Sequence, residues 1–292
     1  AFLFVATPME THAADCQSNI SDGNWSNGAT WTGCNGVGGI PATNDAVTIL
    51  SDTIVTIDSA VEAGEVVIAS GATLVLSGGS AALTLGGISE SANVLLSNSG
   101  TFTADASSTV YLNADNSNLL LSSSAESITF GNLVISPALA EDRTVVLSDN
   151  ISTLNINGNF TIAPSGSKIY TISFGNIVID FATTSVFTID STGTSTSVVT
   201  LPAIDLELAK IVVASGDSLD ASSVSNITLS GTSGTLLTQG GTFTAPTNLI
   251  MNPDAAVTLT SGTVSLVSLT LSPILNEDRV YTFGAGAIST SG

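Results

Sequence analysis

Nucleophilic catalysis is the first chemistry to test, and the sequence offers little with which to perform it. Serine and aspartate are abundant, but the chain holds a single histidine, His12. Both a Ser-His-Asp triad and an activated cysteine nucleophile depend on an adjacent base of this kind. Because we expect His12 to be lost with an N-terminal export signal, we predict no catalytic residues and expect the chain not to be an enzyme.

Paired carboxylates are the catalytic chemistry that stays open. Two acidic side chains that meet across the fold can serve as the acid and the base or nucleophile of a glycosidase. Asp180 with Asp190, and Asp217 with Asp220, are candidates of this kind. With 24 acidic residues in the chain, such pairs are also expected by chance, so the pattern alone does not favour an active site.

A polysaccharide lyase would need a Lys or Arg base beside its carboxylates, and the two arginines, Arg143 and Arg279, are the candidates. Each directly follows a Glu-Asp pair in one of two similar segments. A residue that returns with a repeat is typical of a structural role. We therefore expect Arg143 to pair with Asp142, and Arg279 with Asp278, at a turn, where an exposed ion pair contributes about 0–1 kcal/mol.

Metal chemistry requires clustered ligands, and the strongest donors present are the two cysteines, Cys16 and Cys34. A structural zinc site needs about four ligands of the Cys or His type, and only His12 could join them. We predict no metal site and no cofactor. In an exported protein two cysteines pair without ambiguity, so we predict a Cys16–Cys34 disulfide, with free thiols as the alternative.

The charge balance excludes anionic partners. The chain has 24 acidic and 4 basic residues, a formal net charge of -20, and only 10% charged residues in total. Binding to a phosphate backbone takes clustered Lys and Arg, whereas the basic residues here, Lys168 and Lys210 among them, are far apart in sequence. We expect neither nucleic acid nor an anionic lipid surface as a partner, and the self-repulsion should keep a Ser-, Thr- and Asn-rich surface soluble.

The first residues are similar to the end of an export signal. An apolar stretch at residues 2–6 (FLFVA) is followed by polar residues and by a small-residue segment at 11–14 (THAA), which fits cleavage after Ala13 or Ala14. A buried first strand is the alternative. No other apolar run approaches the ~20 residues that span a bilayer. We predict a chain that is secreted or at the cell surface, without membrane insertion, with residues 1–14 as the remnant of the signal.

A regular strand rhythm begins at about Ala46. Short apolar runs, such as residues 47–49 (VTI), 54–57 (IVTI) and 74–76 (LVL), alternate with clusters of Gly, Ser, Asn and Asp. Period-two alternation bounded by turn residues indicates strands, and Val, Ile and Thr favour them. Residues 204–208 (IDLEL) alternate strictly, so we expect a strand there, and we expect no helix after the signal.

Two pairs of similar segments decide the predicted architecture. GTFTA at residues 100–104 returns at 241–245, and SPALAEDR at 136–143 returns as SPILNEDR at 272–279. These separations indicate a unit of about 140 residues whose second copy is truncated at the C-terminus. A long repeat laid over short strands is typical of a parallel β-solenoid. An array of β-sandwiches is the rival, although it favours units of about 90–100 residues.

Threonines on one strand face could order water, as in ice-binding solenoids. The candidate pairs lie in residues 101–103 (TFT), 242–244 (TFT) and 258–260 (TLT). They are sparse and are not spaced by one coil, so we expect no ice-binding surface.

A family resemblance is carried by residues 24–31 (NWSNGATW), followed by DAVTI at 45–49, and by ITFGNLVIS at 128–136 with LNINGNFTI at 154–162. These segments resemble very large, secreted, adhesin-like bacterial repeat proteins that are built as right-handed parallel β-helices. The motifs are degenerate and cover nearly all of the chain after the signal. The resemblance implies a cell-surface location, and it carries over no catalytic residues.

The sequence thus predicts an all-β fold: a right-handed parallel β-helix with a small disulfide-closed N-terminal cap. The cap would span residues 15–45, with an aromatic plug from residues 24–31 over the open end, and the β-solenoid would span residues 46–292. We expect a non-catalytic, adhesin-like rod that binds glycans or other cell-surface molecules through many weak contacts. The alternatives are a carbohydrate-active lyase or hydrolase on the same fold, and a structural fibre or surface-layer subunit. The oligomeric state is not predicted.

Overall fold

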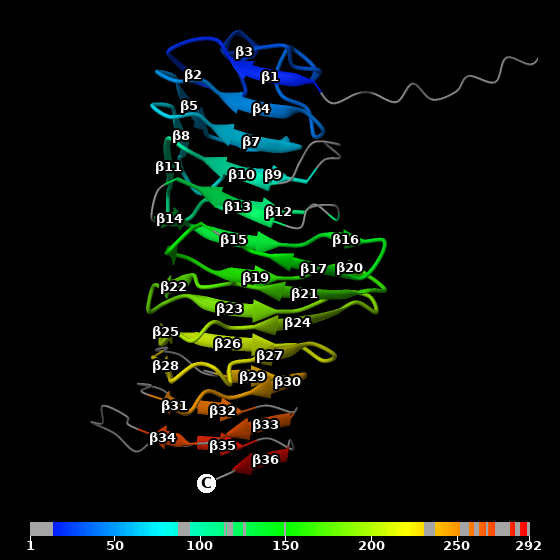
Figure 1. The fold of residues 1–292 in the computed structure, drawn as a ribbon, viewed down its shortest axis with the longest axis vertical. Helices are drawn as coiled ribbons and strands as arrows, with labels where there is room; N and C mark the ends of the chain where they lie inside the picture. The colour runs from blue at the N-terminus through cyan, green and yellow to red at the C-terminus, as the bar shows by residue number, and fades with distance from the viewer. Residues whose placement is uncertain are drawn as a thin grey trace, which may run out of the picture.

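The computed structural model describes residues 14–86, 94–113, 115, 119–124, 127–148, 150–230, 237–251, 257–259, 263–266, 268–271, 281–283 and 287–290. Within these residues the regular secondary structure is almost entirely β-strand, and the strands stack along one axis into a parallel β-solenoid (Figure 1). This confirms the fold class predicted from the sequence. Residues 1–13 of the predicted signal remnant (1–14), together with Arg279 and the segment around it, lie outside the described residues.

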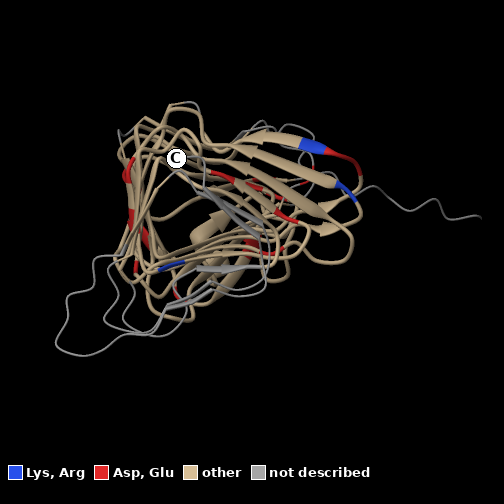
Figure 2. Cartoon of the chain, turned by 90° about the horizontal axis from the view of Figure 1, so that it is seen from below, with Lys and Arg blue, Asp and Glu red and all other residues tan. Residues whose placement is uncertain are grey.

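Each coil of the solenoid carries strands on three faces, and the end-on view shows the three sides (Figure 2). The first face is one 13-stranded sheet, in the spatial order β3 (Trp31–Thr32), β1 (Asp15–Ser18), β4 (Ala46–Ile49), β7 (Glu65–Ile68), β10 (Val94–Asn98), β13 (Leu119–Ser123), β17 (Arg143–Val146), β21 (Ile169–Ser173), β24 (Thr196–Thr200), β27 (Ser218–Asp220), β30 (Thr242–Thr244), β33 (Thr263–Leu266) and β36 (Ala287–Thr290).

The second face is built from three shorter sheets that follow one another along the axis. Their strands are β2 (Asp22–Asn24), β5 (Ile54–Ile57), β8 (Thr73–Leu76) and β11 (Thr101–Ala104); then β14 (Ser127–Phe130), β18 (Thr153–Ile156) and β22 (Val178–Phe181); then β25 (Leu206–Leu208), β28 (Asn226–Leu229), β31 (Asn248–Met251) and β34 (Leu269–Leu271).

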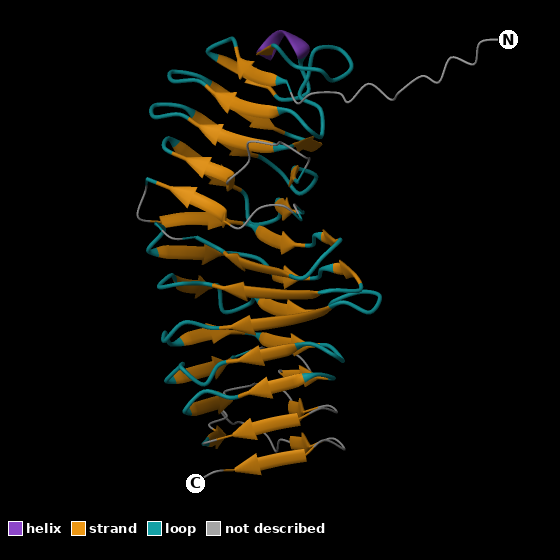
Figure 3. Ribbon diagram, turned by 45° about the vertical axis from the view of Figure 1, so that its right-hand side comes forward, coloured by secondary structure: helices purple, strands orange, loops and turns teal. Residues whose placement is uncertain are grey.

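The third face is one 10-stranded sheet: β6 (Ala60–Ala63), β9 (Ala82–Leu85), β12 (Thr109–Leu112), β15 (Asn132–Ile135), β19 (Phe160–Ile162), β23 (Val186–Ile189), β26 (Lys210–Val213), β29 (Leu237–Gln239), β32 (Val257–Leu259) and β35 (Tyr281–Phe283). A further two-stranded sheet, β16 (Ala138–Leu139) with β20 (Ser165–Gly166), projects to one side of the stack (Figures 1 and 3).

The coils differ in length while their strands stay in register. On the first face Ala46 pairs with Glu65, 19 residues further along, whereas Arg143 pairs with Tyr170, 27 residues further along. Because strand spacing is fixed by backbone hydrogen bonds at about 4.7–4.9 Å, the extra residues are accommodated at the corners between faces and not within the strands.

Alternation along each strand builds the core. Inward residues form rows that run from coil to coil, and on the third face Leu83, Val110, Leu133 and Phe160 are successive, fully buried members of one row. Phe160 and Phe187 continue it with stacked rings whose centroids are 5.1 Å apart. Rows of this kind remove apolar area from water at about 25 cal/mol per Å², which makes this continuous core the main source of stability.

Amide side chains tie successive corners together. The Oδ1 of Asn132 accepts a hydrogen bond from the backbone N–H of Asn159 at 2.9 Å, and the Oδ1 of Asn159 accepts one from the N–H of Val186 at 3.0 Å. Each step spans 27 residues, so the ladder links three consecutive coils. Such bonds satisfy corner N–H groups that no strand partner reaches.

The repeated GTFTA segments occupy different places in the fold. Thr101 lies on the second face in β11, whereas Thr242 lies on the first face in β30. What they share is local: a Cβ on Gly100 would collide with the carbonyl oxygens of Ala69 and Ala72, and a Cβ on Gly241 with those of Ala214 and Asp217. The motif therefore marks a corner where the backbone of one coil approaches the next, and the unit of about 140 residues stays a prediction.

Helix is nearly absent, as the sequence predicts. In the described part of the chain the sole helix is the 3-10 helix η1 (Gly28–Thr30), which lies at the N-terminal end of the stack (Figure 3). It begins at Asn27, whose side chain accepts a hydrogen bond from the N–H of Ala29. This helix falls far short of the length needed to cross a membrane.

Candidate functional site

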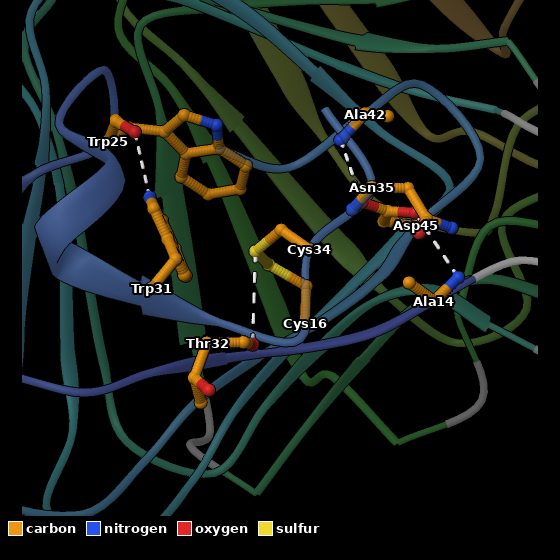
Figure 4. The surroundings of a disulfide bond; sticks show 9 residues. All are labelled: Ala14, Cys16, Trp25, Trp31, Thr32, Cys34, Asn35, Ala42 and Asp45. Carbon is orange, nitrogen blue, oxygen red and sulfur yellow. Dashed lines mark hydrogen bonds between the residues drawn. A yellow bond between two sulfur atoms is a disulfide. The ribbon is translucent and has the colours of Figure 1, made fainter. Parts of the chain in front are cut away.

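The predicted disulfide is present between Cys16 and Cys34, with a Cα–Cα distance of 4.5 Å. Cys16 is fully buried on β1, and Cys34 follows β3, so the bond ties the loop after β3 to the first face (Figure 4). Disulfides stabilise chiefly by restricting the unfolded chain. Here the restriction falls on the N-terminal end of the stack formed by the described residues.

The two tryptophans fill the end of the core, as predicted. Trp25 and Trp31 are 1% and 5% exposed, and their rings meet edge to face with centroids 4.8 Å apart. The indole N–H of Trp31 donates a hydrogen bond of 2.7 Å to the carbonyl of Trp25 (Figure 4). Burying an indole with its N–H satisfied avoids the cost of an unpaired donor, so the pair closes the apolar interior.

Asp45 is a structural residue of the cap that the sequence did not single out. Its side chain is buried, and its carboxylate accepts hydrogen bonds from the backbone N–H groups of Ala14, Asn35 and Ala42 at 3.2, 2.9 and 2.9 Å (Figure 4). Bonds from neutral donors to a charged acceptor are among the stronger ones. One carboxylate thus holds three separate parts of the cap together.

Cys16, Cys34 and Asp45 also form the one group of potential metal ligands within the described residues, with donor atoms inside 4.8 Å of one another. The two sulfurs are bonded to each other, whereas a cysteine binds metal as a thiolate. The Asp45 oxygens are used by three backbone donors. The donor set therefore does not fit a metal ion while the disulfide is intact.

Asp217, a carboxylate weighed for catalysis, has a structural environment. It is 1% exposed, and its oxygens accept bonds from the N–H of Ser191 at 2.9 Å, the hydroxyl of Ser191 at 2.6 Å and the N–H of Ser197 at 2.7 Å. Asp220 instead accepts a bond from the N–H of Ser222. A carboxylate so surrounded by donors ties two coils together and offers no free oxygen to a substrate.

Asp180 and Asp190, the other candidate pair, are not brought onto one face. Asp180 lies in β22 on the second face, and Asp190 follows β23 of the third face. Both side chains are exposed. The structure thus places the two carboxylates on different faces of the solenoid.

Arg143 pairs across coils and not with the neighbour expected from the sequence. Its Nε donates to Oδ1 of Asp115, 28 residues earlier, at 3.0 Å, and its second contact is Glu141, also at 3.0 Å. Asp142 instead accepts a bond from the N–H of Ile169. The prediction of an Arg143–Asp142 pair was wrong because acceptors in the previous coil are as close as sequence neighbours.

Next to Arg143 on the first face is a buried polar side chain that the sequence did not reveal. Tyr170, in register with Arg143, is 1% exposed, and its hydroxyl has no hydrogen-bond partner in the described structure. Burial, reinforced by the nearby charge of Asp115, raises the pKa of Tyr170 well above its usual value. Arg143 and Tyr170 are thus neighbours in the packing of this corner.

The threonines considered for water ordering lie on three different faces. Thr101 and Thr103 are in β11 on the second face, Thr242 and Thr244 in β30 on the first, and Thr258 in β32 on the third. Thr260, the remaining candidate, lies outside the described residues, and the described threonines are not aligned on one face.

A hollow of about 600 Å³ lies at the N-terminal end of the third face, between β6 and the cap segment at residues 35–43. Its apolar lining includes Trp25, Val37, Ile40, Pro41 and Val61, and its polar lining includes Asn35, Thr43, Glu62 and Thr84. This volume is within the range of ligand pockets, about 300–1,000 Å³. Its size and its mixed apolar and polar lining suit it to receive another molecule, and no sequence motif indicates it.

Comparison with known proteins gives no match: no protein-family model, no curated protein and no solved structure matches the chain. The functional argument therefore depends on the fold and on the geometry of its side chains.

Proposed function

We propose that this chain is a non-catalytic, exported repeat protein, adhesin-like, secreted or held at the cell surface, which acts as a stiff rod that presents binding surfaces. The uninterrupted stack of parallel strands supports this proposal. A row of exposed and half-exposed side chains, Thr144, Thr171, Val198, Ser218 and Thr242, follows the first face in register from coil to coil.

Such a row offers small, mostly hydroxylated side chains at the strand spacing of about 4.8 Å. A surface of this kind suits a partner that repeats, such as a glycan, because each coil contributes one weak contact and many contacts act together. The acidic residues, distributed over more than one side (Figure 2), would favour neutral or basic partners over anionic ones.

The export proposal is supported by the cap. A disulfide that closes a small cap is expected in an oxidising compartment and unusual in the cytosol, and both cysteines of the chain are used in it. The non-catalytic proposal is supported by Asp217 and Arg143, whose polar atoms are engaged in bonds between coils.

The test is a glycan array probed with the chain as a monomer and as a biotin–streptavidin tetramer. We expect signal from the tetramer on repeating glycans and little from the monomer. Thr171→Glu on the first face should weaken binding, whereas Thr188→Glu, a matched threonine on β23 of the third face, should not. Turnover of an array polysaccharide would contradict the proposal and favour a carbohydrate-active enzyme; regular assembly of the chain without ligand would favour a structural fibre.

A further inference from the structure

The three faces of the solenoid are not closed equally at the N-terminal end. On the first face β4 is covered by the cap strand β1, and on the second face β5 is covered by β2. On the third face the first strand is β6, which pairs with β9 alone among the residues that the structure describes. Between β2 and β4 the chain forms η1, β3 and a loop, so the cap contributes no strand to the third face.

The edge of β6 that faces the cap carries main-chain groups that find no strand partner among the described residues. The N–H of Ala82 bonds to the carbonyl of Ser59, and that of Gly86 to the carbonyl of Ala63. Because main-chain groups alternate in direction along a parallel strand, those of Ala60 and Glu62 point the other way, towards the cap. No described backbone group bonds to them, and only at Gly64 does the edge find a partner, the carbonyl of Asp45. A free edge of this kind is a template for another strand.

The inward row of the third face shows that apolar surface is also left uncovered here. Val61 heads the row that continues with Leu83, Val110 and Leu133, and these later members are at most 1% exposed. Val61 itself is only partly buried. Across the hollow, Val37 on the cap loop is 95% exposed. Two apolar side chains thus border this edge of β6, and both are accessible in the part of the chain that the structure describes.

The rim of the hollow has one strong electrostatic feature. The carboxylate of Glu62 is exposed and accepts a hydrogen bond from the hydroxyl of Thr43 on the cap loop. No Lys or Arg lines the hollow, and the chain as a whole carries a net charge of -20. Electrostatic complementarity therefore favours a partner with a basic side chain at this position.

We propose that the hollow binds a short extended peptide from another protein, which adds a strand to the free edge of β6. The peptide backbone would pair with the main-chain groups of Ala60 and Glu62, as in strand-addition complexes. An apolar side chain would enter the hollow between Val61 and Val37, and a neighbouring Lys or Arg would meet Glu62. The site is independent of the outward rows invoked for glycan binding.

The probe is an acetylated and amidated pentapeptide in which valine alternates with lysine, added to the full chain. Titration calorimetry measures the affinity, and the emission of the chain's two tryptophans reports the site because Trp25 lines the hollow. We expect one peptide per chain, with binding weakened by added salt. A peptide that alternates valine with glutamate, and one with N-methylated backbone, should each bind at least tenfold more weakly.

Three variants test the contacts. Ala60→Pro removes only an N–H that points away from the β6–β9 ladder, which an edge strand tolerates, and we expect at least a tenfold loss of affinity. Val37→Asp, on an exposed loop that cannot affect the core, should give a several-fold loss. Glu62→Gln should weaken the lysine peptide several-fold, whereas Glu207→Gln, an exposed glutamate on β25, should leave the affinity unchanged.

Four outcomes overturn the proposal. Equal binding of the N-methylated peptide, or no effect of Ala60→Pro in a protein with unchanged circular dichroism, would exclude strand addition. Self-association of the chain that Ala60→Pro abolishes would identify a second copy as the occupant. Peptide binding seen only after removal of residues 1–13 would show that the chain's own N-terminus fills the hollow.

Discussion

Asp45 in the cap and Asp217 in the body are both 1% exposed, and both accept bonds from backbone N–H groups. Their surroundings differ. Near Asp217 each strand pairs with a strand of the coil before it and a strand of the coil after it, and the rows of buried side chains continue into both coils. Around Asp45 stacking is incomplete, and a disulfide and a tryptophan pair hold the segments instead. In the described part of the cap, cross-links thus supplement incomplete stacking, whereas the body depends on close backbone fit between coils.

The largest effect is expected from a change in that backbone fit. Gly100→Ala places a Cβ against the carbonyl oxygens of Ala69 and Ala72, and backbone atoms cannot move aside as a side chain can. We expect a loss of about 3 kcal/mol or more in the free energy of unfolding, measured by urea denaturation. Gly79→Ala, where a Cβ meets only Ser107 at ordinary contact distance, is the control. A similar loss in both variants would contradict the argument from backbone fit.

Removal of the disulfide should affect the cap and spare the body. The bond closes a segment with a sequence separation of 18, for which chain entropy gives about 3 kcal/mol. In the double variant Cys16→Ser/Cys34→Ser we expect faster hydrogen exchange in β1 and β4, with β19 and β23 unchanged. Equal loss of protection in all four strands would show that cap and body unfold as one unit.

The two buried carboxylates allow a matched pair of substitutions. Asp45→Asn and Asp217→Asn each remove a charge and one acceptor from a site with several N–H donors, so each should cost about 1–3 kcal/mol. Because the cap has fewer other contacts, Asp45→Asn should increase hydrogen exchange only near residues 35–45. If Asp217→Asn instead left stability unchanged and altered an enzymatic activity, the structural role assigned to Asp217 would be wrong.

The smallest effect is a pH dependence at the junction of cap and body. Burial, and then the charge of Asp15, raises the pKa of Glu65 above its ordinary value. The folded state therefore holds this proton more strongly than the unfolded state. The contribution is fully favourable below the unfolded pKa and is lost as the pH rises through the folded value.

Glu65→Gln should remove this loss of stability with rising pH and should stabilise the protein at neutral pH relative to the native chain. The measurement is the difference in melting temperature between the two proteins at pH 4 and at pH 7, with Glu207→Gln as the control for a loss of charge elsewhere. An equal gain in the control at pH 7 would attribute the effect to net charge and not to the site.

The strands, the core rows and the disulfide could be predicted because their signals are local. Alternation assigns residues such as Val110 and Leu133 to the interior without knowledge of register, and two cysteines allow one pairing. The partner of Arg143 and the donors around Asp45 could not be predicted. These contacts depend on which residues of neighbouring coils lie next to each other. That register depends on the length of each corner, and Gly and Ser occur in short and long corners alike, so the composition of a corner does not reveal its length.

The GTFTA segments also show that similarity in sequence does not reveal where a segment lies in the fold. Their similarity reflects a glycine that fits a crowded corner and a phenylalanine two residues later, a combination useful at more than one corner of the solenoid. The uncovered edge of β6 had no signal of its own, because the absence of a strand from the cap leaves no pattern in the residues around it.

The unequal coil lengths have a mechanical consequence. If the two ends of the rod were pulled apart, coils would detach one after another, since each contacts chiefly its neighbours. A coil with a 27-residue register, such as that from Arg143 to Tyr170, would release about 90 Å of chain at the extended length per residue. The 19-residue coil from Ala46 to Glu65 would release about 65 Å. The solenoid would thus lengthen under tension in unequal steps.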